Sequence, residues 1–233
     1  MPTPRRVPAG PDASRYAPGL PDPDLPADEE ELQHRTQPPL TGGDHDGELF
    51  PADLDLSGVD ARDARFLGCV VRCARADALQ LAGARFVDCR ITGLGATEAP
   101  WRAGTWRDTV VEGCRIGALD LSTASWNRVL VRGGRVDFAN LRGAELVDVT
   151  FDGVDLRDLD LGSANLRRVR FSGCRIGRLD VTGARLEAVD LRGSDITDGL
   201  DGVGDLRGAV VSSSQLLQLA PLMAAHLGVV VED

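Results

Sequence analysis

An apolar residue occupies every fifth position from Leu56 to Ile196, without one insertion or deletion. All 29 of these positions are apolar, although only 42% of the chain is hydrophobic. A helix repeats every 3.6 residues and a half-buried strand every 2, so neither keeps these positions on one face. A chain that turns a corner every five residues does. The pattern therefore predicts a coil in which each five-residue unit forms one side and points its large residue inward.

A second inward position lies two residues before each large one, and it usually holds a small side chain. Four units complete one coil, because the sequence also repeats every twenty residues. A glycine column with this period predicts a corner that needs positive φ, and Cys73 replaces glycine in the first full coil. The small inward residues include Ala64, Cys69, Ala84, Cys89, Cys114, Ala124, Ala144, Ala164, Cys174 and Ala184, and the glycines are Gly93, Gly113, Gly133, Gly153, Gly173 and Gly193.

The repeat unit resembles that of the pentapeptide-repeat family, which reads Ala-(Asp/Asn)-Leu-x-x. Good copies are Ala139-Asn140-Leu141-Arg142-Gly143 and Ala164-Asn165-Leu166-Arg167-Arg168. The resemblance implies an all-β solenoid, a right-handed quadrilateral β-helix, to which the sequence adds a short C-terminal helix. Among its branches the chain resembles the quinolone-resistance proteins that interact with gyrase, but its unbroken register leaves no projecting loops.

The chain divides into three expected regions. Residues 1–48 hold most of the 13 prolines and ten acidic residues, which predicts a disordered acidic arm. Residues 49–211 form the β-helix. The register falters after Ile196, where Gly199 and Asp201 take inward positions, so we expect one looped-out side before Leu206 resumes the pattern. Residues 212–233 form a C-terminal cap or dimerisation segment.

The C-terminal segment has the signals of a helix. Ser212 to Ser214 offer an N-cap, residues 215–227 have helical periodicity, Pro221 predicts a kink and Gly228 an end. Its apolar stripe is more than one coil end can bury, which predicts a homodimer through this segment. The alternative is a cap on the last coil of the same chain. The stripe consists of Leu216, Leu219, Met223 and Leu227.

Composition and motifs argue against several classes of function. The net charge of -10 disfavours direct binding to nucleic acid or an anionic membrane. Because no apolar run reaches membrane-spanning length and no signal-peptide core is present, we expect a soluble, cytoplasmic protein. His34, His45 and His226 assemble no triad or zinc site, so neither catalysis nor a cofactor is expected. The buried cysteines have a packing role, although Cys69 and Cys89 are close enough in register for a disulfide.

Two functions remain. The first is a non-enzymatic scaffold that binds an unidentified protein. The second, implied by the resemblance, is a DNA mimic that binds a type II topoisomerase, DNA gyrase, and modulates or protects it. Its candidate contacts are Asp120, Asp160 and Asp180, which the twenty-residue period places in one column on the outside of the coil.

Magnitudes limit the mimicry hypothesis. Eight coils at about 4.8 Å give a rod about 38 Å long. A duplex of this length carries about 22 charges. Residues 51–233 contain 26 acidic and 22 basic side chains, so their net charge is only -4. Mimicry must therefore rest on the acidic column alone.

Overall fold

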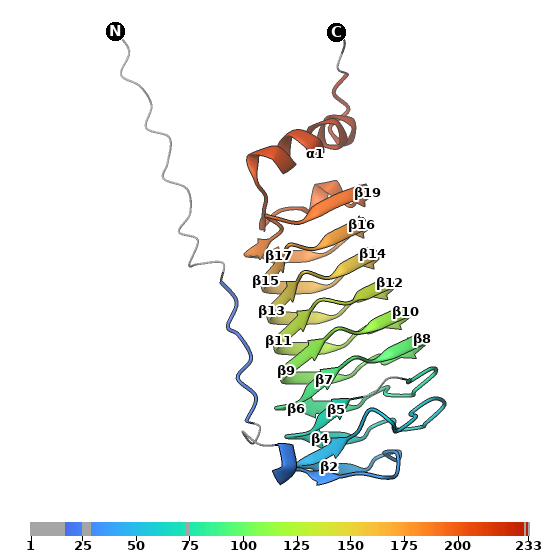
Figure 1. Ribbon diagram of the computed structural model, residues 1–233. Coiled ribbons are helices and arrows are strands. Elements are labelled where there is room, and N and C mark those ends of the chain that lie inside the picture. The colour runs from blue at the N-terminus through green and yellow to red at the C-terminus, as the bar shows by residue number, and fades with distance from the viewer. Residues whose placement is uncertain (1–16, 25–28, 73–74, 231, 233) are drawn as a thin grey trace.

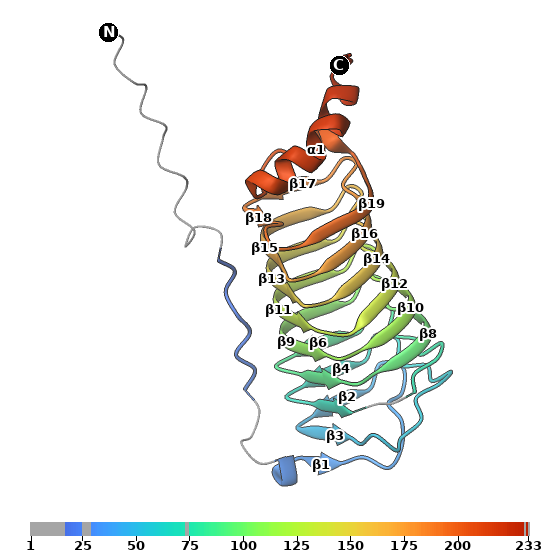
Figure 2. The same cartoon turned by 45° about the horizontal axis from the view of Figure 1, so that its top comes forward.

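A computed structural model describes residues 17–24, 29–72, 75–230 and 232. The chain winds into a parallel β-solenoid of about eight turns with one short helix at its C-terminal end (Figures 1 and 2). The predicted all-β solenoid is confirmed. Cys73 lies outside the described residues, so its place at the first corner stays a prediction.

Successive turns pair through parallel strands into two sheets. The larger sheet covers two sides of the coil, because one long strand such as β9 pairs with both β6 and β7 of the previous turn. Its strands are β1 (Gln33–His34), β2 (Asp44–Asp46), β3 (Glu48–Phe50), β4 (Arg65–Leu67), β5 (Val70–Arg72), β6 (Arg85–Val87), β7 (Arg90–Thr92), β9 (Thr105–Glu112), β11 (Ser125–Arg132), β13 (Glu145–Asp152), β15 (Asn165–Ser172), β17 (Arg185–Glu187), β18 (Val189–Asp190) and β20 (Ala209–Val210).

The smaller sheet forms the third side, and tight turns form the fourth. Its strands are β8 (Gly95–Pro100), β10 (Arg115–Asp120), β12 (Arg135–Asn140), β14 (Asp155–Asp160), β16 (Arg175–Asp180) and β19 (Asp195–Asp201). The described helices are the 3-10 helices η2 (Glu29–Glu31) and η3 (Val203–Asp205) and the α-helix α1 (Ser213–His226).

The period of twenty is confirmed by the register of the strands. Trp106 pairs with Trp126 and Leu146 with Leu166, so each inward column consists of residues twenty apart. Both inward positions are closed to solvent, as Ala144 and Leu146 show with 0% exposure. The core is therefore one narrow apolar cylinder that runs along the whole solenoid.

Stacked aromatic rings fill one side of this cylinder. The ring centroids of Phe66 and Phe86 are 4.5 Å apart, and those of Phe86 and Trp106 are 4.4 Å apart. These spacings match the distance between neighbouring strands, since each ring lies directly above its partner in the previous turn. The same register that pairs the backbone thus stacks the rings.

The glycine corner has positive φ, as predicted. At Gly93, φ is 69°, and at Gly153 it is 64°. A Cβ atom at either residue would meet nothing within 4 Å, so backbone conformation and not space selects glycine. A second corner, in the middle of the long strands, reaches positive φ without glycine, for example at Asp148 with φ 57°.

The solenoid begins earlier than the boundary expected at residue 49. Strand β1 pairs with β3, and β2 pairs with β4, which places His45 over Phe66. The offset between these two residues is 21 and not 20, because the chain between Phe50 and Leu56 contains one extra residue. This extra residue breaks the five-residue pattern, so the sequence analysis wrongly assigned residues 33–48 to the arm. Residues 1–16 and 25–28 lie outside the described residues, and disorder there stays a prediction.

The irregularity after Ile196 is smaller than expected. Ile196 pairs with Ile176 at an offset of 20, whereas Leu200 pairs with Leu179 at an offset of 21. One extra residue is therefore accommodated as a bulge within β19, and the offset returns to 20 at Val189 and Ala209, after η3. The bulge turns Leu200 inward, where it is 8% exposed.

Part of the N-terminal arm lies along the outside of the solenoid. Residues 17–24 run beside the long strands in both views (Figures 1 and 2). The Gly19 backbone N–H donates to Asp148 Oδ1 at 3.0 Å, and Pro18 is buried. This segment therefore contacts the corner of the long strands near Asp148.

Candidate functional site

The predicted acidic column exists as a line of backbone neighbours. Asp120 pairs with Asn140, Asn140 with Asp160, and Asp160 with Asp180. Asp201 follows Asp180 at the end of β19. The column lies where the smaller sheet ends and the turns of the fourth side begin.

Each of the column's carboxylates also has a structural task at this corner. One side-chain oxygen accepts a hydrogen bond from the backbone N–H two residues later, which is the geometry of an Asx turn. Asn140 makes the same turn through its amide oxygen, so the amide suffices. The bonds run to Asp120 from Ser122 at 3.0 Å, to Asp160 from Gly162 at 2.8 Å and to Asp180 from Thr182 at 2.8 Å.

Arginines of the fourth side neutralise part of the column. Arg142 Nη1 donates to both oxygens of Asp160 at 2.9 Å and lies 3.5 Å from Asp180 Oδ2. Arg102 Nε lies 4.0 Å from Asp120 Oδ2. The sequence analysis placed the three carboxylates in one column and missed these pairs. The available signal was the arginine two residues after Pro100 and Asn140.

The three candidate carboxylates are only partly accessible. The side chains of Asp120, Asp160 and Asp180 are 34%, 17% and 24% exposed. Hydrogen bonding from Thr182 lowers the pKa of Asp180, and burial opposes this shift. The column therefore offers less free negative charge to a partner than the sequence suggests.

The C-terminal helix is fixed to the last full turn at its first residues. Ser212 Oγ accepts from the Gln215 backbone N–H at 3.2 Å, and Gln215 Oε1 accepts from the Ser212 N–H at 2.8 Å. The Gln215 amide nitrogen donates to the carbonyl oxygens of Leu191 and Ser194 at 2.7 and 2.8 Å. The predicted cap is confirmed, and its glutamine also holds the helix to the solenoid. Figure 1 shows the helix changing direction midway, in keeping with Pro221 inside it.

The predicted dimer stripe is split by the fold. Leu219 is 5% exposed and belongs to the solenoid core, against which Met223 also packs. These two residues pack on their own chain, and the dimer interface stays a prediction. Leu216 and Leu227 are 48% and 74% exposed. Further exposed apolar residues at this end are Leu217 at 76%, Leu222 at 42%, Val229 at 55% and Val230 at 79% exposure.

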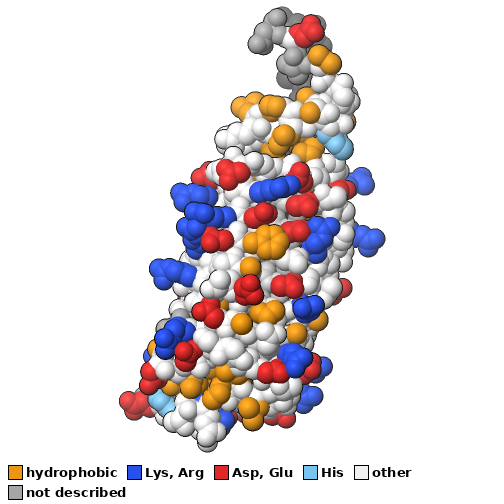
Figure 3. All heavy atoms as spheres, turned by 90° about the vertical axis from the view of Figure 1, so that its right-hand side faces the viewer, with side chains coloured by type: hydrophobic (Ala, Val, Ile, Leu, Met, Phe, Trp, Pro, Cys, Tyr) orange, Lys and Arg blue, Asp and Glu red, His pale blue; other side chains and the backbone are white. Residues whose placement is uncertain are grey.

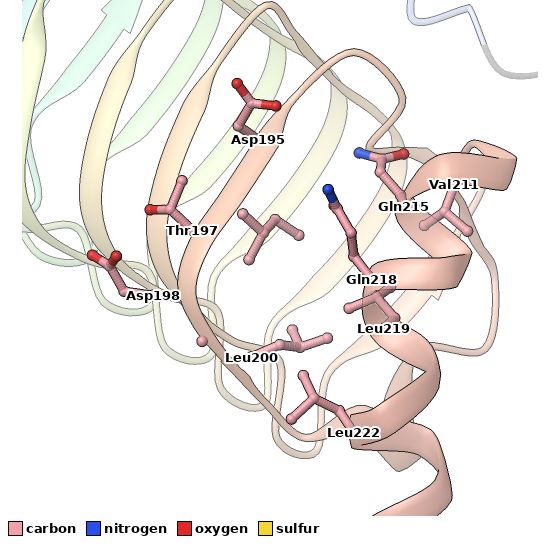
Figure 4. A pocket seen from close by; sticks show the side chains of 11 residues that line it. Asp195, Thr197, Asp198, Leu200, Val211, Gln215, Gln218, Leu219 and Leu222 are labelled. Carbon is pink, nitrogen blue, oxygen red and sulfur yellow. The ribbon is translucent and has the colours of Figure 1, made fainter. Parts of the chain in front are cut away.

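A hollow of about 530 Å³ separates α1 from the last strand of the smaller sheet. Figure 4 shows Thr197 and Leu200 of β19 on one side and Gln218 and Leu222 of the helix on the other. β19 pairs only with β16 among the described strands, so its outer edge faces this hollow. The helix therefore covers the end of the core without pairing the open edge of the sheet.

The described histidines and cysteines lie outside the column. His45 lies between Phe50 and Phe66 and places Nδ1 2.7 Å from Glu48 Oε2, whereas His34 and His226 are exposed. Burial raises the pKa of the Cys89 thiol. All four described cysteines are free, so the conceivable Cys69–Cys89 disulfide is not formed.

Two searches of the described ranges complete the site analysis. No group of three or more His, Cys, Asp or Glu side chains in residues 17–24, 29–72, 75–230 and 232 is arranged to hold a metal ion. None of the helices in that part of the chain is long and apolar enough to cross a bilayer.

The sides of five residues, the twenty-residue turn and the central leucines define a four-sided parallel β-solenoid. The family described as pentapeptide repeats matches residues 137–173 with eight copies of its repeat. Residues 137–173 therefore carry the repeat of this family. The repeat extends well beyond the matched residues, because the pairing offset of twenty holds from β4 to β16.

Matches among solved structures include QnrB1 and HetL. A trypsin-treated variant of QnrB1, a plasmid-mediated fluoroquinolone resistance protein, is 18% identical over 86% of this chain and all of that one, with a TM-score of 0.30. HetL from the cyanobacterium Nostoc sp. strain PCC 7120, involved in heterocyst differentiation regulation, is 15% identical over 74% of this chain and 91% of its own, with a TM-score of 0.25. No curated protein sequence matches the chain.

Proposed function

We propose that this protein is a non-enzymatic scaffold whose solenoid binds another protein. The observation that carries the proposal is the outer face of the smaller sheet. Its six parallel strands hold outward side chains in fixed register, and one of them, Phe138, is an exposed aromatic residue. A rigid surface loses little conformational entropy on binding, and aromatic residues are enriched in protein interfaces.

A second candidate is binding to DNA gyrase as a DNA mimic. The acidic column of Asp120, Asp160 and Asp180 favours it, because these carboxylates recur along the rod as phosphates do along a duplex. Their engagement by Arg102 and Arg142 weakens it, since a paired carboxylate attracts a basic surface less strongly. We therefore place gyrase second.

The C-terminal end supports a homodimer as part of this proposal. Leu216 and Leu217 on α1 and Leu227 directly after it are exposed, and the outer edge of β19 is unpaired among the described strands. Figure 3 shows hydrophobic side chains gathered at this end of the molecule. A second copy would cover apolar surface that the chain leaves in water. The C-terminal end of one protomer would pack on the same end of its partner, because a two-fold axis pairs identical surfaces.

Affinity capture followed by chemical cross-linking of the captured proteins to the bait tests the scaffold proposal. The bait is the full chain, and the matched control carries Phe138→Asp together with Asp158→Arg on the outer face of the smaller sheet. We expect one or more proteins cross-linked to this face by the wild type and lost with the control. Purified gyrase in the same assay tests the alternative. Cross-links that map only to other faces would contradict the proposed binding surface.

A further inference from the structure

Phe138 is an unusual residue for the outside of this fold. It is 42% exposed, whereas the other Phe and Trp side chains of the described residues are at most 5% exposed. It lies two residues after the inward residue Val136, at a position where the neighbouring turns place Ala118 and Asp158. Core packing therefore does not explain an aromatic ring here.

The ring forms one wall of a surface hollow of about 260 Å³. Ala118, whose side chain is small, pairs with Phe138 on one side and with Glu98 on the other, so these three residues form a line across three strands. The hollow is also lined by Pro100 and Asp120. Figure 3 looks onto this side of the molecule and shows a hydrophobic patch at mid-height with acidic and basic side chains around it.

The electrostatics of the hollow are one-sided. Glu98 is exposed, and no described cation lies within ion-pair distance of it. Asp120 adds a second carboxylate, whose nearest guanidinium nitrogen in the described structure is Arg102 Nε at 4.0 Å. No basic side chain lines the hollow. An anionic ligand group is therefore repelled from the hollow. An apolar group would bury the Glu98 carboxylate without an ion-pair or hydrogen-bond partner, which is unfavourable.

We infer that this hollow is a socket for one arginine side chain of a protein partner. The guanidinium would stack on the Phe138 ring and donate to Glu98, while the apolar stem would cover Ala118 and Pro100. A planar guanidinium can stack and donate two parallel hydrogen bonds, which a lysine ammonium cannot. The volume equals that of about nine water molecules, which accommodates the seven heavy atoms of an arginine side chain.

This inference rests on the proposed protein-binding function but is tested without the partner. Acetyl-glycyl-arginyl-glycinamide serves as the probe and is titrated into the ¹⁵N-labelled full chain at 150 mM salt. Matched peptides carry lysine or uncharged citrulline in place of arginine. We expect saturable shifts of backbone amides in β8, β10 and β12 with arginine, weaker ones with lysine and none with citrulline.

Variants locate the binding energy. We expect Glu98→Gln and Phe138→Leu each to raise the Kd of the arginine peptide about threefold or more, because one removes the charge and the other the aromatic face. Asp152→Asn is the control, since it also removes one carboxylate but lies on the larger sheet and does not line the hollow. These positions lie on the outside of strands, and thermal unfolding confirms that each variant is folded.

Equal shifts with arginine and citrulline, or unchanged affinity in both Glu98→Gln and Phe138→Leu, would overturn the socket. Such a result leaves the cross-linking test of the scaffold unaffected, because that test does not depend on arginine. Conversely, a scaffold that captures no protein contradicts the proposed function even where the peptide binds. The two failures are thus distinguishable.

Discussion

Both carboxylate oxygens of Asp148 accept hydrogen bonds from the guanidinium of Arg168, at 2.6 Å from Nε and 2.5 Å from Nη2. The two residues are twenty apart, so the pair joins consecutive turns at the corner of the long strands. Arg128 and Asp108 form the same pair two turns earlier. These bidentate pairs hold together a corner that has positive φ without glycine.

The Asp148–Arg168 pair predicts a pH-dependent stability. Hydrogen bonds from Arg168 lower the pKa of Asp148, burial opposes the shift, and the Gly19 N–H adds to it. Because the folded pKa is depressed, this stability is present above the ordinary range near 4 and is lost as the pH falls through the folded pKa. We expect Asp148→Asn to reduce the free energy of unfolding by about 1–2 kcal/mol at pH 7.

Chemical denaturation at a series of pH values measures this effect. The difference between Asp148→Asn and wild type should shrink as the pH falls below about 4. Asp152→Asn is the control. The Asp152 side chain is 46% exposed, and its Oδ2 lies 3.5 Å from Arg132 Nε, a longer and more exposed pair than Asp148–Arg168. A difference that stays constant down to pH 2 would show that packing, and not the charge, is responsible.

The tight interior predicts that Ala144→Leu is destabilising. Ala144 is 0% exposed and occupies the small inward position, so three added carbon atoms must displace neighbouring turns. We expect a loss of about 1–3 kcal/mol in the free energy of unfolding. Asn165→Ala, at an exposed position in the following turn, should change it by less than about 0.5 kcal/mol. Equal melting midpoints for the two variants would contradict the packing argument.

The acidic column predicts a separation of fold from charge. Changing Asp120, Asp160 and Asp180 to Asn keeps an oxygen for each Asx turn, as Asn140 already does. We expect the triple variant to fold and, if gyrase is the partner, to bind it more weakly than wild type at low salt. Supercoiling assays measure this. Inhibition by wild type and variant to the same extent would exclude the column as the contact.

The exposed end of α1 predicts a dimer that two charges abolish. We expect wild type to be dimeric at micromolar concentration and Leu217→Glu with Leu227→Glu to be monomeric, because both side chains are more than 70% exposed. Ser214→Glu is the control at the exposed start of the helix. Light scattering gives the masses. A monomeric wild type would reduce the helix to a cap, the role that Leu219 already has.

The sequence predicts most of the solenoid because the rule for an inward residue is local. Each regular turn contains twenty residues, so the residues that pair with Phe66 or Leu146 in the neighbouring turns follow from counting. The first turn escapes this count, since one extra residue between Phe50 and Leu56 shifts His45 out of the pattern. The bulge in β19 is equally invisible, because the sequence does not show where the surplus residue is accommodated.

The candidate site is less predictable than the fold because it depends on the reach of side chains. Counting places Asp160 in the acidic column but does not show that Arg142 folds back onto it from the neighbouring turn. Periodicity likewise puts Leu219 and Leu227 on one stripe, and only the path of the helix over the last turn separates them. The sequence shows Phe138 as an aromatic residue at an outward position, but the hollow beside it depends on the small side chain of Ala118 in the neighbouring strand.

The constant rise per turn makes this molecule a ruler with discrete divisions. The hollow beside Phe138 and the edge of β19 are separated by the three steps from β12 to β19, about 14 Å at the strand spacing. A partner that touches both must match that distance. Because a regular turn takes twenty residues, inserting whole turns would lengthen this separation in steps of about one strand spacing.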